Sequence, residues 1–214
     1  MSVAKLTVQV VTASLSVLDP PVVVLVRHGE TDWTRSGRHT GVSDIPLTAA
    51  GRGQARDLGR LLRAWSFALV LTSPSSRARE TCRLAGFEDR AVVEPELREW
   101  NYGRYEGLTT HEIRKQESGW TVWDGPTPEG EIPEEVAARA DGIIERAKGT
   151  GGNTVLFGHG HMLRVLASRW VSGDPRDGRH LALATASISV LGWERDTPVL
   201  QLWNRTPEPG GDSD

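Results

Sequence analysis

Two arginines and two histidines have the side chains and the spacing that chemistry on a phosphate group needs. Arg27 and His28 are adjacent, Arg77 follows a Ser-Pro-Ser-Ser segment, and His159 lies between two glycines. Guanidinium groups match phosphate oxygens in bidentate geometry, and an imidazole serves as a nucleophile or a proton carrier. No thiol or carboxylate set accompanies the histidines at a zinc-ligand spacing. These residue types favour a phosphate site, although each residue taken alone is equally typical of a surface loop.

Each of these groups follows a short apolar run that must position it. The runs cover residues 22–26, 67–71 and 154–157, and each leads toward a segment of helical periodicity. Such runs are typical of strands buried on both faces of a sheet. Strand and helix alternation predicts a largely parallel sheet, whose strand ends share one ligand-binding edge. We therefore expect an α/β protein, a three-layer α/β/α sandwich with a mostly parallel central sheet.

Periodicity and end signals predict the other elements. Thr48 is a suitable N-cap and Pro133 a suitable first helical residue. Two further strands are joined by a turn at 196–198. We expect helices at 49–64, 76–85, 110–117, 133–148 and around 163–170, the two further strands at 188–193 and 199–203, and a loop at 31–44.

The predicted helix at 76–85 has an unfavourable charge at its start. Arg77 and Arg79 both lie in its first turn, where cations oppose the helix dipole. An anion bound there would offset this unfavourable interaction between the arginines and the helix dipole, because the backbone amides, the dipole and the guanidinium would all favour the same ligand. The simpler alternative is that both side chains extend into water.

Acidic and aromatic residues alternate through the middle of the chain, from Glu94 to Trp123. A glutamate pressed among aromatic rings loses hydration and is protonated more easily, as a general acid requires. Two interpretations of the aromatic residues stay open, a rim around the site or ordinary core packing. The residues concerned are Trp33, Trp100, Tyr102, Tyr105 and the segment 120–130.

Composition limits the classes of function. The chain has 214 residues, 38% of them hydrophobic, and a formal net charge of −3. This length suits one domain, and the charge offers no basic excess for nucleic acid or an anionic membrane. The single cysteine, Cys82, excludes an internal disulfide and is compatible with the cytoplasm, where we expect the protein. No apolar run is long enough to span a membrane.

The two ends differ in composition from the rest. We expect residues 1–21 to be an N-terminal extension, either an added edge strand or a loosely held tail, and a signal peptide matches them poorly. The globular domain is expected at 22–205. The Pro/Gly/Asp-rich residues 206–214 are predicted to be a disordered tail.

Several motifs occur together in one order along the chain. They are Leu25-Val26-Arg27-His28-Gly29-Glu30-Thr31, Ser43 to Thr48 with Gly51 and Gln54-Ala55, Ser73-Pro74-Ser75-Ser76-Arg77 with Thr81, Glu99 with Gly103 and Glu106-Gly107, and Gly158-His159-Gly160. In this combination the sequence resembles the histidine phosphatase superfamily, which includes phosphoglycerate mutases and acid phosphatases. The resemblance runs from about Val22 to Trp203 and implies a phosphoglycerate mutase-like fold.

The resemblance implies a role for each matching residue. His28 matches the nucleophile that becomes phosphohistidine, and Glu99 matches the proton donor. Arg27, Arg77 and His159 match the groups that hold the phosphoryl oxygens. Expected contacts with the phosphate or the rest of the substrate are Gly160, Thr34, Arg38 and His39. Glu30 is expected to orient the residues of the pocket without touching the substrate itself. No metal or other cofactor is implied.

Two departures from the mutase pattern favour a hydrolase. Thr34 follows Trp33 where mutases of this family usually have Asn, and the stretch between Glu99 and His159 is short. We therefore expect a metal-independent phosphomonoesterase acting on a small phosphate ester. The alternatives are a mutase-type phosphoryl transfer and a catalytically silent phosphate-binding module.

Other properties follow less directly. Protonation of the site histidines would suggest an acidic pH optimum. His111, His161 and His180 are interpreted as surface or structural residues. The sequence does not identify the physiological substrate and leaves the oligomeric state open, with a homodimer as one option; no nucleic-acid or membrane partner is expected.

Overall fold

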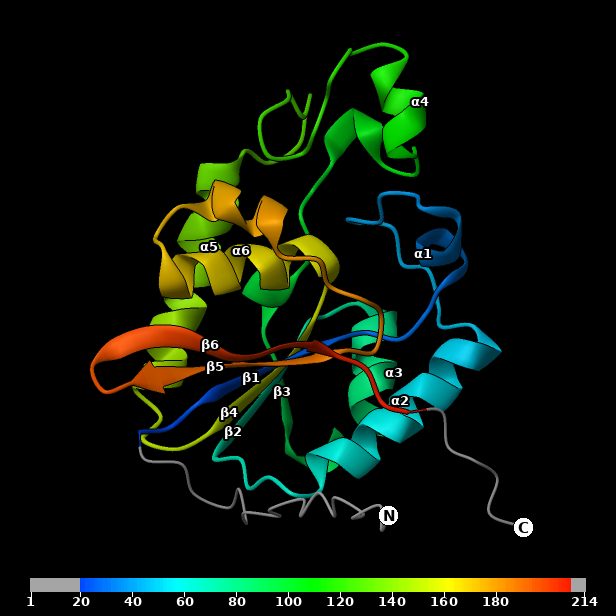
Figure 1. Cartoon of the computed structure of the whole chain (residues 1–214). Coiled ribbons are helices and arrows are strands. Elements are labelled where there is room, and N and C mark those ends of the chain that lie inside the picture. Colours follow the sequence, from blue (N-terminus) through cyan, green and yellow to red (C-terminus); the bar gives the residue numbers. More distant parts are fainter. Residues whose placement is uncertain (1–19, 209–214) are drawn as a thin grey trace, which may run out of the picture.

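A six-stranded sheet forms the centre of the computed structural model, which describes residues 20–208 (Figure 1). The strands lie in the order β3-β2-β4-β1-β5-β6. The first four in this order are mutually parallel, whereas β5 is antiparallel to β1 and β6 to β5. The strand bounds are β1 Val23–Arg27, β2 Leu69–Thr72, β3 Ala91–Val93, β4 Thr154–Gly158, β5 Ile188–Glu194 and β6 Thr197–Arg205.

Five of these strands match the predicted runs within two residues, and β3 was not predicted. Most of the predicted extension at 1–21 and of the predicted tail at 206–214 lies outside the described residues.

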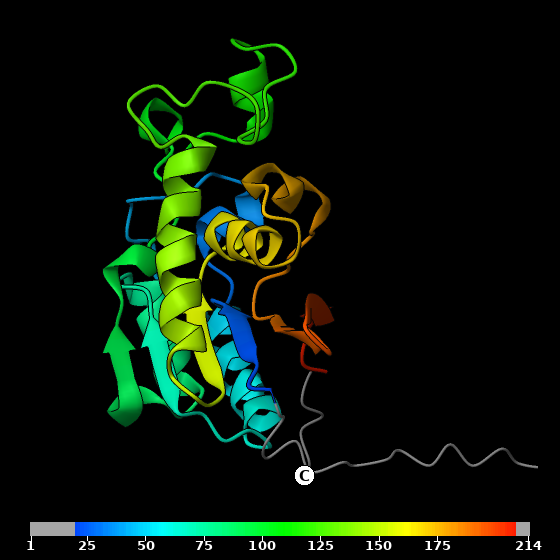
Figure 2. The ribbon, with the colours of Figure 1, turned by 90° about the vertical axis from the view of Figure 1, so that its left-hand side faces the viewer.

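Helices cover both faces of the sheet. The side chains of β1 alternate between them: Val23 and Leu25 join the core cluster beneath α5 and α6, and Val24 and Val26 join the cluster beneath α2 and α3. Figures 1 and 2 show these two helix pairs on opposite sides of the strands. The predicted three-layer sandwich is therefore confirmed. The helix bounds are α1 Asp32–Ser36, α2 Ala49–Leu62, α3 Ser76–Leu84, α4 Thr110–Arg114, α5 Pro133–Lys148 and α6 Gly160–Val171.

The predicted loop at 31–44 contains a short helix, α1, which corrects that prediction. Thr31 is its N-cap, and Thr31 and Thr34 form a reciprocal capping box. Thr34 Oγ1 also donates to the Thr31 carbonyl, at 2.9 Å. Gly37 ends the helix in the left-handed region, at φ 71°, where glycine carries no Cβ penalty. The glycine-rich appearance of this segment therefore reflects a helix end rather than irregular chain throughout.

The turn after β1 packs directly on the first turn of α2. A Cβ on Gly29 would lie 2.4 Å from the Gly51 carbonyl oxygen, and one on Gly51 would lie 2.2 Å from that of Glu30. Only hydrogen at these two positions allows the backbones to approach so closely. Glu30 Oε1 accepts a hydrogen bond from Thr48 Oγ1 at 2.8 Å. Glu30 therefore fixes the start of α2 against the segment that carries His28.

The aromatic residues of the middle segment belong to the core, so of the two interpretations left open the core one holds for most of them. Trp100, Tyr102, Tyr105 and Trp120 are buried. The rings of Trp100 and Trp123 meet edge to face with centroids 5.8 Å apart, a favourable geometry for aromatic pairs.

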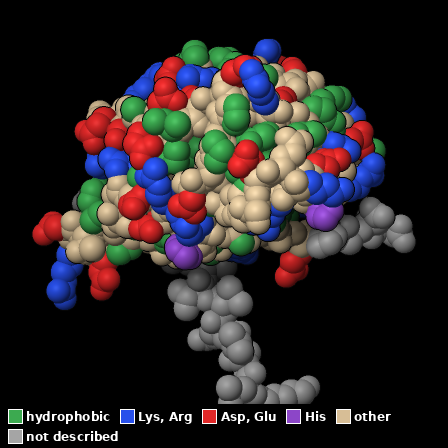
Figure 3. All heavy atoms as spheres, turned by 90° about the horizontal axis from the view of Figure 1, so that it is seen from above, with side chains coloured by type: hydrophobic (Ala, Val, Ile, Leu, Met, Phe, Trp, Pro, Cys, Tyr) green, Lys and Arg blue, Asp and Glu red, His purple; other side chains and the backbone are tan. Residues whose placement is uncertain are grey.

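The outer surface is mixed in character. On the face seen from above, acidic and basic side chains are interspersed with small apolar areas (Figure 3). Within residues 20–208, no helix has the length and apolar character needed to cross a membrane.

Candidate active site

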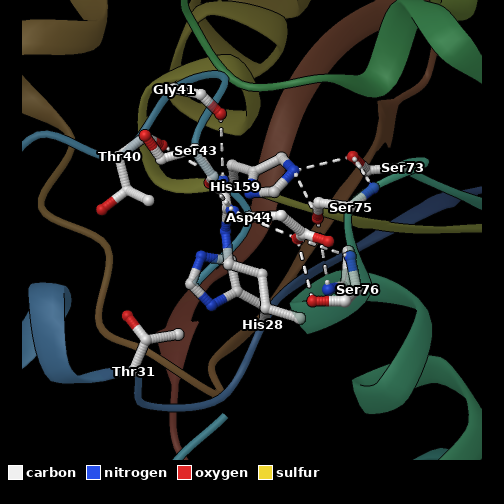
Figure 4. Close-up of polar contacts among 12 residues, drawn as sticks. His28, Thr31, Thr40, Gly41, Ser43, Asp44, Ser73, Ser75, Ser76 and His159 are labelled. Atoms are coloured by element: carbon white, nitrogen blue, oxygen red, sulfur yellow. Dashed lines mark hydrogen bonds and ion pairs between the residues drawn. The ribbon is translucent and has the colours of Figure 1, made fainter. Parts of the chain in front are cut away.

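The ends of three neighbouring strands bring the predicted site residues together. β2, β4 and β1 lie side by side, and they lead directly into Ser73, His159 and His28. The rings of His28 and His159 are 5.1 Å apart between centroids (Figure 4). The backbone N–H of His28 donates to the Gly158 carbonyl at 3.0 Å. Both histidines are therefore tied to the rigid edge of the sheet.

The hydrogen bond of His28 determines which ring nitrogen is free. Nδ1 lies 2.7 Å from the carbonyl oxygen of Gly29, its own neighbour. A carbonyl oxygen only accepts, so Nδ1 carries the proton. Burial, together with the nearby charges of Arg77 and Arg27, holds the pKa of His28 well below its ordinary value. The ring is therefore neutral, and Nε2 presents a lone pair that can attack an electrophile.

His159 is oriented by two serines. Its Nε2 lies 2.7 Å from Ser73 Oγ and 3.3 Å from Ser75 Oγ, as the dashed lines in Figure 4 show. Burial, followed by the charge of Arg77, also lowers the pKa of His159 well below its ordinary value. Ser73 Oγ also accepts from the Ser75 N–H at 3.4 Å, and within residues 20–208 His159 Nε2 is the one acceptor near the buried Ser73 hydroxyl proton, so we assign the hydroxyl as the donor. The ring proton then lies on Nδ1, which is buried and has no partner among the described residues.

Arg27 reaches from the end of β1 across the start of α6. Its Nη1 donates to the Leu183 carbonyl, and a Cβ on Gly160 would lie 3.3 Å from its Cζ. A side chain at position 160 would press on this guanidinium. Its Nε is buried and has no partner among residues 20–208.

Arg77 is buried in the first turn of α3, with 1% of its surface exposed. Its two terminal nitrogens donate to the carbonyls of Thr40, Gly41 and Ser43 at 2.8–3.3 Å, while its Nε has no partner in the described part of the chain. Arg79, one of the two cations in the predicted first turn, is exposed. The alternative that both side chains extend into water therefore holds for Arg79 and is wrong for Arg77, whereas an anion bound beside Arg77 stays a prediction.

Glu99 lies against the amino end of α6. Its Oε1 accepts from the N–H groups of Trp100 and Met162, and its Oε2 accepts from that of His161, at 2.8–3.0 Å. A carboxylate at this position complements the positive end of the helix dipole. The three bonds fix its oxygens beside His159.

Most predicted site residues line one cavity of about 170 Å³. It includes the predicted residues Arg27, His28, Thr34, Arg38, His39, Glu99 and Gly160. Arg77 does not border it, and His159 instead borders a neighbouring hollow of about 450 Å³ that also reaches Glu99. Glu30 borders neither of the two.

Six residues that line the cavity were not among the predicted site residues, and three of these six have titratable side chains. Tyr102, His161 and Arg164 line the cavity, and His161 was interpreted as a surface or structural residue. His161 follows His159 by two positions, so the pattern Gly-His-Gly-His was the signal that could have found it. His111 and His180 are exposed, as interpreted.

The structure does not support the reason given for an acidic pH optimum, which was protonation of the site histidines. The pKa values of His28 and His159 are both lowered, chiefly by burial, so the two rings are neutral in the free protein near neutral pH. Their neutrality suits a nucleophilic Nε2. Protonated site histidines are therefore not the source of any acidic optimum.

Comparisons with known proteins agree with this geometry. Residues 23–206 match the family model of the histidine phosphatase superfamily (branch 1). The chain is 40% identical over 191 residues to an acid phosphatase of Mycobacterium tuberculosis, covering 87% of this chain and 94% of that one. It is 35% identical over 182 residues to the sedoheptulose 1,7-bisphosphatase of Saccharomyces cerevisiae, covering 70% and 67%.

Solved structures show the same fold. The product of an open reading frame of M. tuberculosis superposes with a TM-score of 0.83 at 37% identity, covering 88% of this chain and 99% of that chain. With residues 23–206 matched and the fold shared, the chain belongs to the histidine phosphatase superfamily, branch 1, as a phosphatase of the phosphoglycerate mutase-like fold.

Proposed function

We propose that the protein is a metal-independent phosphomonoesterase that hydrolyses a small phosphate ester through a phosphohistidine on His28. One observation carries the proposal. Four buried side-chain nitrogen or oxygen atoms lack a partner within residues 20–208, and three of them are Arg27 Nε, Arg77 Nε and His159 Nδ1. An unpaired buried polar group costs about 1–3 kcal/mol. Three such nitrogens around one imidazole are explained by a ligand that supplies acceptor oxygens, as a phosphoryl group does.

In the first step, His28 Nε2 attacks phosphorus in line with the ester oxygen. The N–P bond forms while the ester P–O bond breaks, and the electron pair of that bond leaves with the oxygen. Arg27, Arg77 and the N–H of His159 hold the other three oxygens as charge redistributes among them. Phosphoryl transfer depends chiefly on such positioning and charge stabilisation. Each of these donors was fixed by the fold before the substrate arrived.

Glu99 supplies the protons for both steps. In its protonated form it donates to the leaving ester oxygen, which departs as an alcohol. As a carboxylate it then takes a proton from the water that attacks the phosphohistidine. The N–P bond breaks, inorganic phosphate leaves, and His28 and Glu99 return to their starting forms.

The proposal is tested by hydrolysis of p-nitrophenyl phosphate in the presence of a chelator. The wild-type protein is expected to release phosphate and, with ³²P-labelled substrate, to carry an alkali-stable, acid-labile label. His28→Ala removes the label and the turnover. Arg77→Ala lowers kcat/KM about 100-fold or more, whereas the matched control Arg79→Ala, two residues along the same helical turn, keeps wild-type turnover.

Three outcomes would contradict the proposal. Undiminished turnover in His28→Ala would exclude the phosphohistidine. Interconversion of monophosphoglycerates that depends on a bisphosphate primer, without net hydrolysis, would identify a mutase. A catalytically silent module would bind phosphate and form no labelled protein.

A further inference from the structure

His161, which is partly buried, and Tyr102, which is buried, form a hydrogen-bonded pair beside the proposed centre. Tyr102 Oη lies 2.6 Å from His161 Nδ1, and the ring of Trp123 packs against His161 with centroids 5.4 Å apart. Burial raises the pKa of Tyr102 well above its ordinary value and lowers that of His161 well below it. Tyr102 therefore keeps its proton and His161 is neutral.

The pairing fixes the tautomer of His161. Within residues 20–208, Nδ1 of His161 is the one acceptor within hydrogen-bond reach of the Tyr102 hydroxyl proton, and we assign the hydroxyl as the donor because this arrangement leaves no buried hydroxyl proton unpaired. The imidazole proton then lies on Nε2, which has no partner in the described part of the chain. Because the ring lines the cavity that holds His28 and Glu99, it offers the cavity a neutral N–H donor.

Arg164, one helical turn after His161, lines the same cavity. Its Cζ lies 4.7 Å above the ring of Trp123, and its Nε and Nη2 donate to the carbonyls of Gly178 and Arg179 at 2.9 and 3.3 Å. No carboxylate of residues 20–208 lies within 4.0 Å of its nitrogens, and Nη1 has no partner there. Packing and two hydrogen bonds thus hold a half-buried cation that has no salt bridge within residues 20–208, although the more distant charge of Glu99 favours it. An anion that paired with this cation would offset part of its desolvation cost.

One phosphoryl group does not use these donors. In the proposed mechanism its oxygens are held by Arg27, Arg77 and His159, so His161 Nε2 and Arg164 Nη1 are left over. Both are donors, and one carries a full charge. Of the two other arginines at the cavity, Arg27 is used in the proposed mechanism, and Arg38 differs because Glu112 lies 3.4 Å from its Nη1. The unused pair is therefore suited to a ligand group with acceptor oxygens and negative charge.

We propose that His161 and Arg164 form a second anion subsite, so that the favoured substrate is a compact phosphate ester carrying another anionic group, either a phosphate or a carboxylate. This inference rests on the proposed phosphatase function and specifies its substrate class. The cavity volume of about 170 Å³ leaves room for a small group at this subsite. Tyr102 acts through His161 as a positioning residue, because its hydroxyl sets which nitrogen carries the proton.

Two matched pairs of substrates separate the two kinds of anion. 3-Phosphoglycerate differs from glycerol 3-phosphate by a carboxylate, and fructose 1,6-bisphosphate differs from fructose 6-phosphate by a second phosphate. We expect wild-type kcat/KM to favour the doubly anionic member of at least one pair by about tenfold or more, since a charge-assisted hydrogen bond contributes that much. Which pair shows the preference identifies the second group.

Variants locate the preference. Arg164→Gln keeps a polar N–H donor on a shorter side chain but loses the charge, and it should reduce the preference about tenfold, mainly through KM. His161→Ala and Tyr102→Phe should reduce it as well, whereas His161→Asn keeps an N–H donor and should retain more of it than His161→Ala. Arg79→Gln is the control, because Arg79 is exposed and outside the cavity, and should leave the preference intact.

The possible results distinguish failure of the second anion subsite from failure of the proposed phosphatase function. Hydrolysis of p-nitrophenyl phosphate with no preference in either pair, or a preference that Arg164→Gln and His161→Ala leave unchanged, would overturn the subsite. A protein that hydrolyses none of these compounds would refute the phosphatase. In that case calorimetric binding to the same pairs tests the subsite directly, and equal affinities within both pairs would overturn it.

Discussion

Ser73 should control catalysis although it is not expected to touch the substrate. Its side chain and that of His159 are both buried, and their polar atoms are 2.7 Å apart. In Ser73→Ala the acceptor Nε2 loses its donor. The ring then moves its proton from Nδ1 to Nε2 or tilts toward Ser75 Oγ, which is 3.3 Å away. Either response removes the Nδ1–H donor from the position where a phosphoryl oxygen is expected.

The size of the effect follows from what is lost. One buried hydrogen bond is removed, and one donor to the developing charge goes with it. Loss of such a donor raises the barrier by about 1.4–2.7 kcal/mol, which is about a 10- to 100-fold fall in kcat. The residual activity should stay above that of Arg77→Ala, since the imidazole is still present.

The assay is steady-state hydrolysis of p-nitrophenyl phosphate, with thermal unfolding measured on the same samples. Ser76→Ala is the matched control: its hydroxyl donates to Asp44 at 2.8 Å and does not contact His159. It should keep wild-type kcat. The reasoning would be refuted if Ser73→Ala kept kcat within about twofold of wild type, or if its loss of kcat equalled that of Ser76→Ala.

Two further predictions concern stability. Gly29→Ala places a Cβ 2.4 Å from the Gly51 carbonyl and should lower the free energy of unfolding by about 3 kcal/mol or more. Gly142→Ala, in α5 with open space around the new Cβ, should raise it by about 0.5–1 kcal/mol; urea unfolding that ranks them the other way would contradict the packing argument. The pKa of His39 is lowered by burial from 6.5 to about 4, so between these values the unfolded chain binds a proton that the folded protein does not, and stability falls as pH falls. His39→Gln should make this decline shallower in urea titrations at pH 7 and pH 5, and parallel declines in both proteins would refute the assignment.

Continuous apolar runs made the central strands predictable from the sequence. Residues 22–26 are apolar without alternation, as a strand covered on both faces requires, and β1 lies there. The predicted parallel arrangement was sufficient to place the charged residues that follow these runs at one edge of the sheet, because the carboxyl ends of parallel strands meet there. The edge strand β3 lacks this signal, because it has three residues and Val92 and Val93 are exposed.

The proposed second subsite was not visible in the sequence for a different reason. Tyr102 and His161 are 59 residues apart, and no periodic pattern links them. Arg164 looks like an ordinary polar residue on an amphipathic helix. Its lack of a salt bridge within residues 20–208 is a property of the folded surroundings, so only the structure distinguishes it from the basic residues that form surface ion pairs.

The position of Glu99 at the amino end of α6 gives one carboxylate two tasks. If it is also the proposed proton donor, each turnover removes a proton from the group that caps the helix and then returns one to it. Protonation would cost the first turn of α6 an acceptor while the substrate reacts beside it. The hydrogen bonds at the start of this helix would then weaken and strengthen once in each catalytic cycle. Protonation of Glu99 would therefore couple the chemical step to a local opening of the first turn of α6. Loss of activity on replacing Glu99 would accordingly combine a missing acid with a frayed helix.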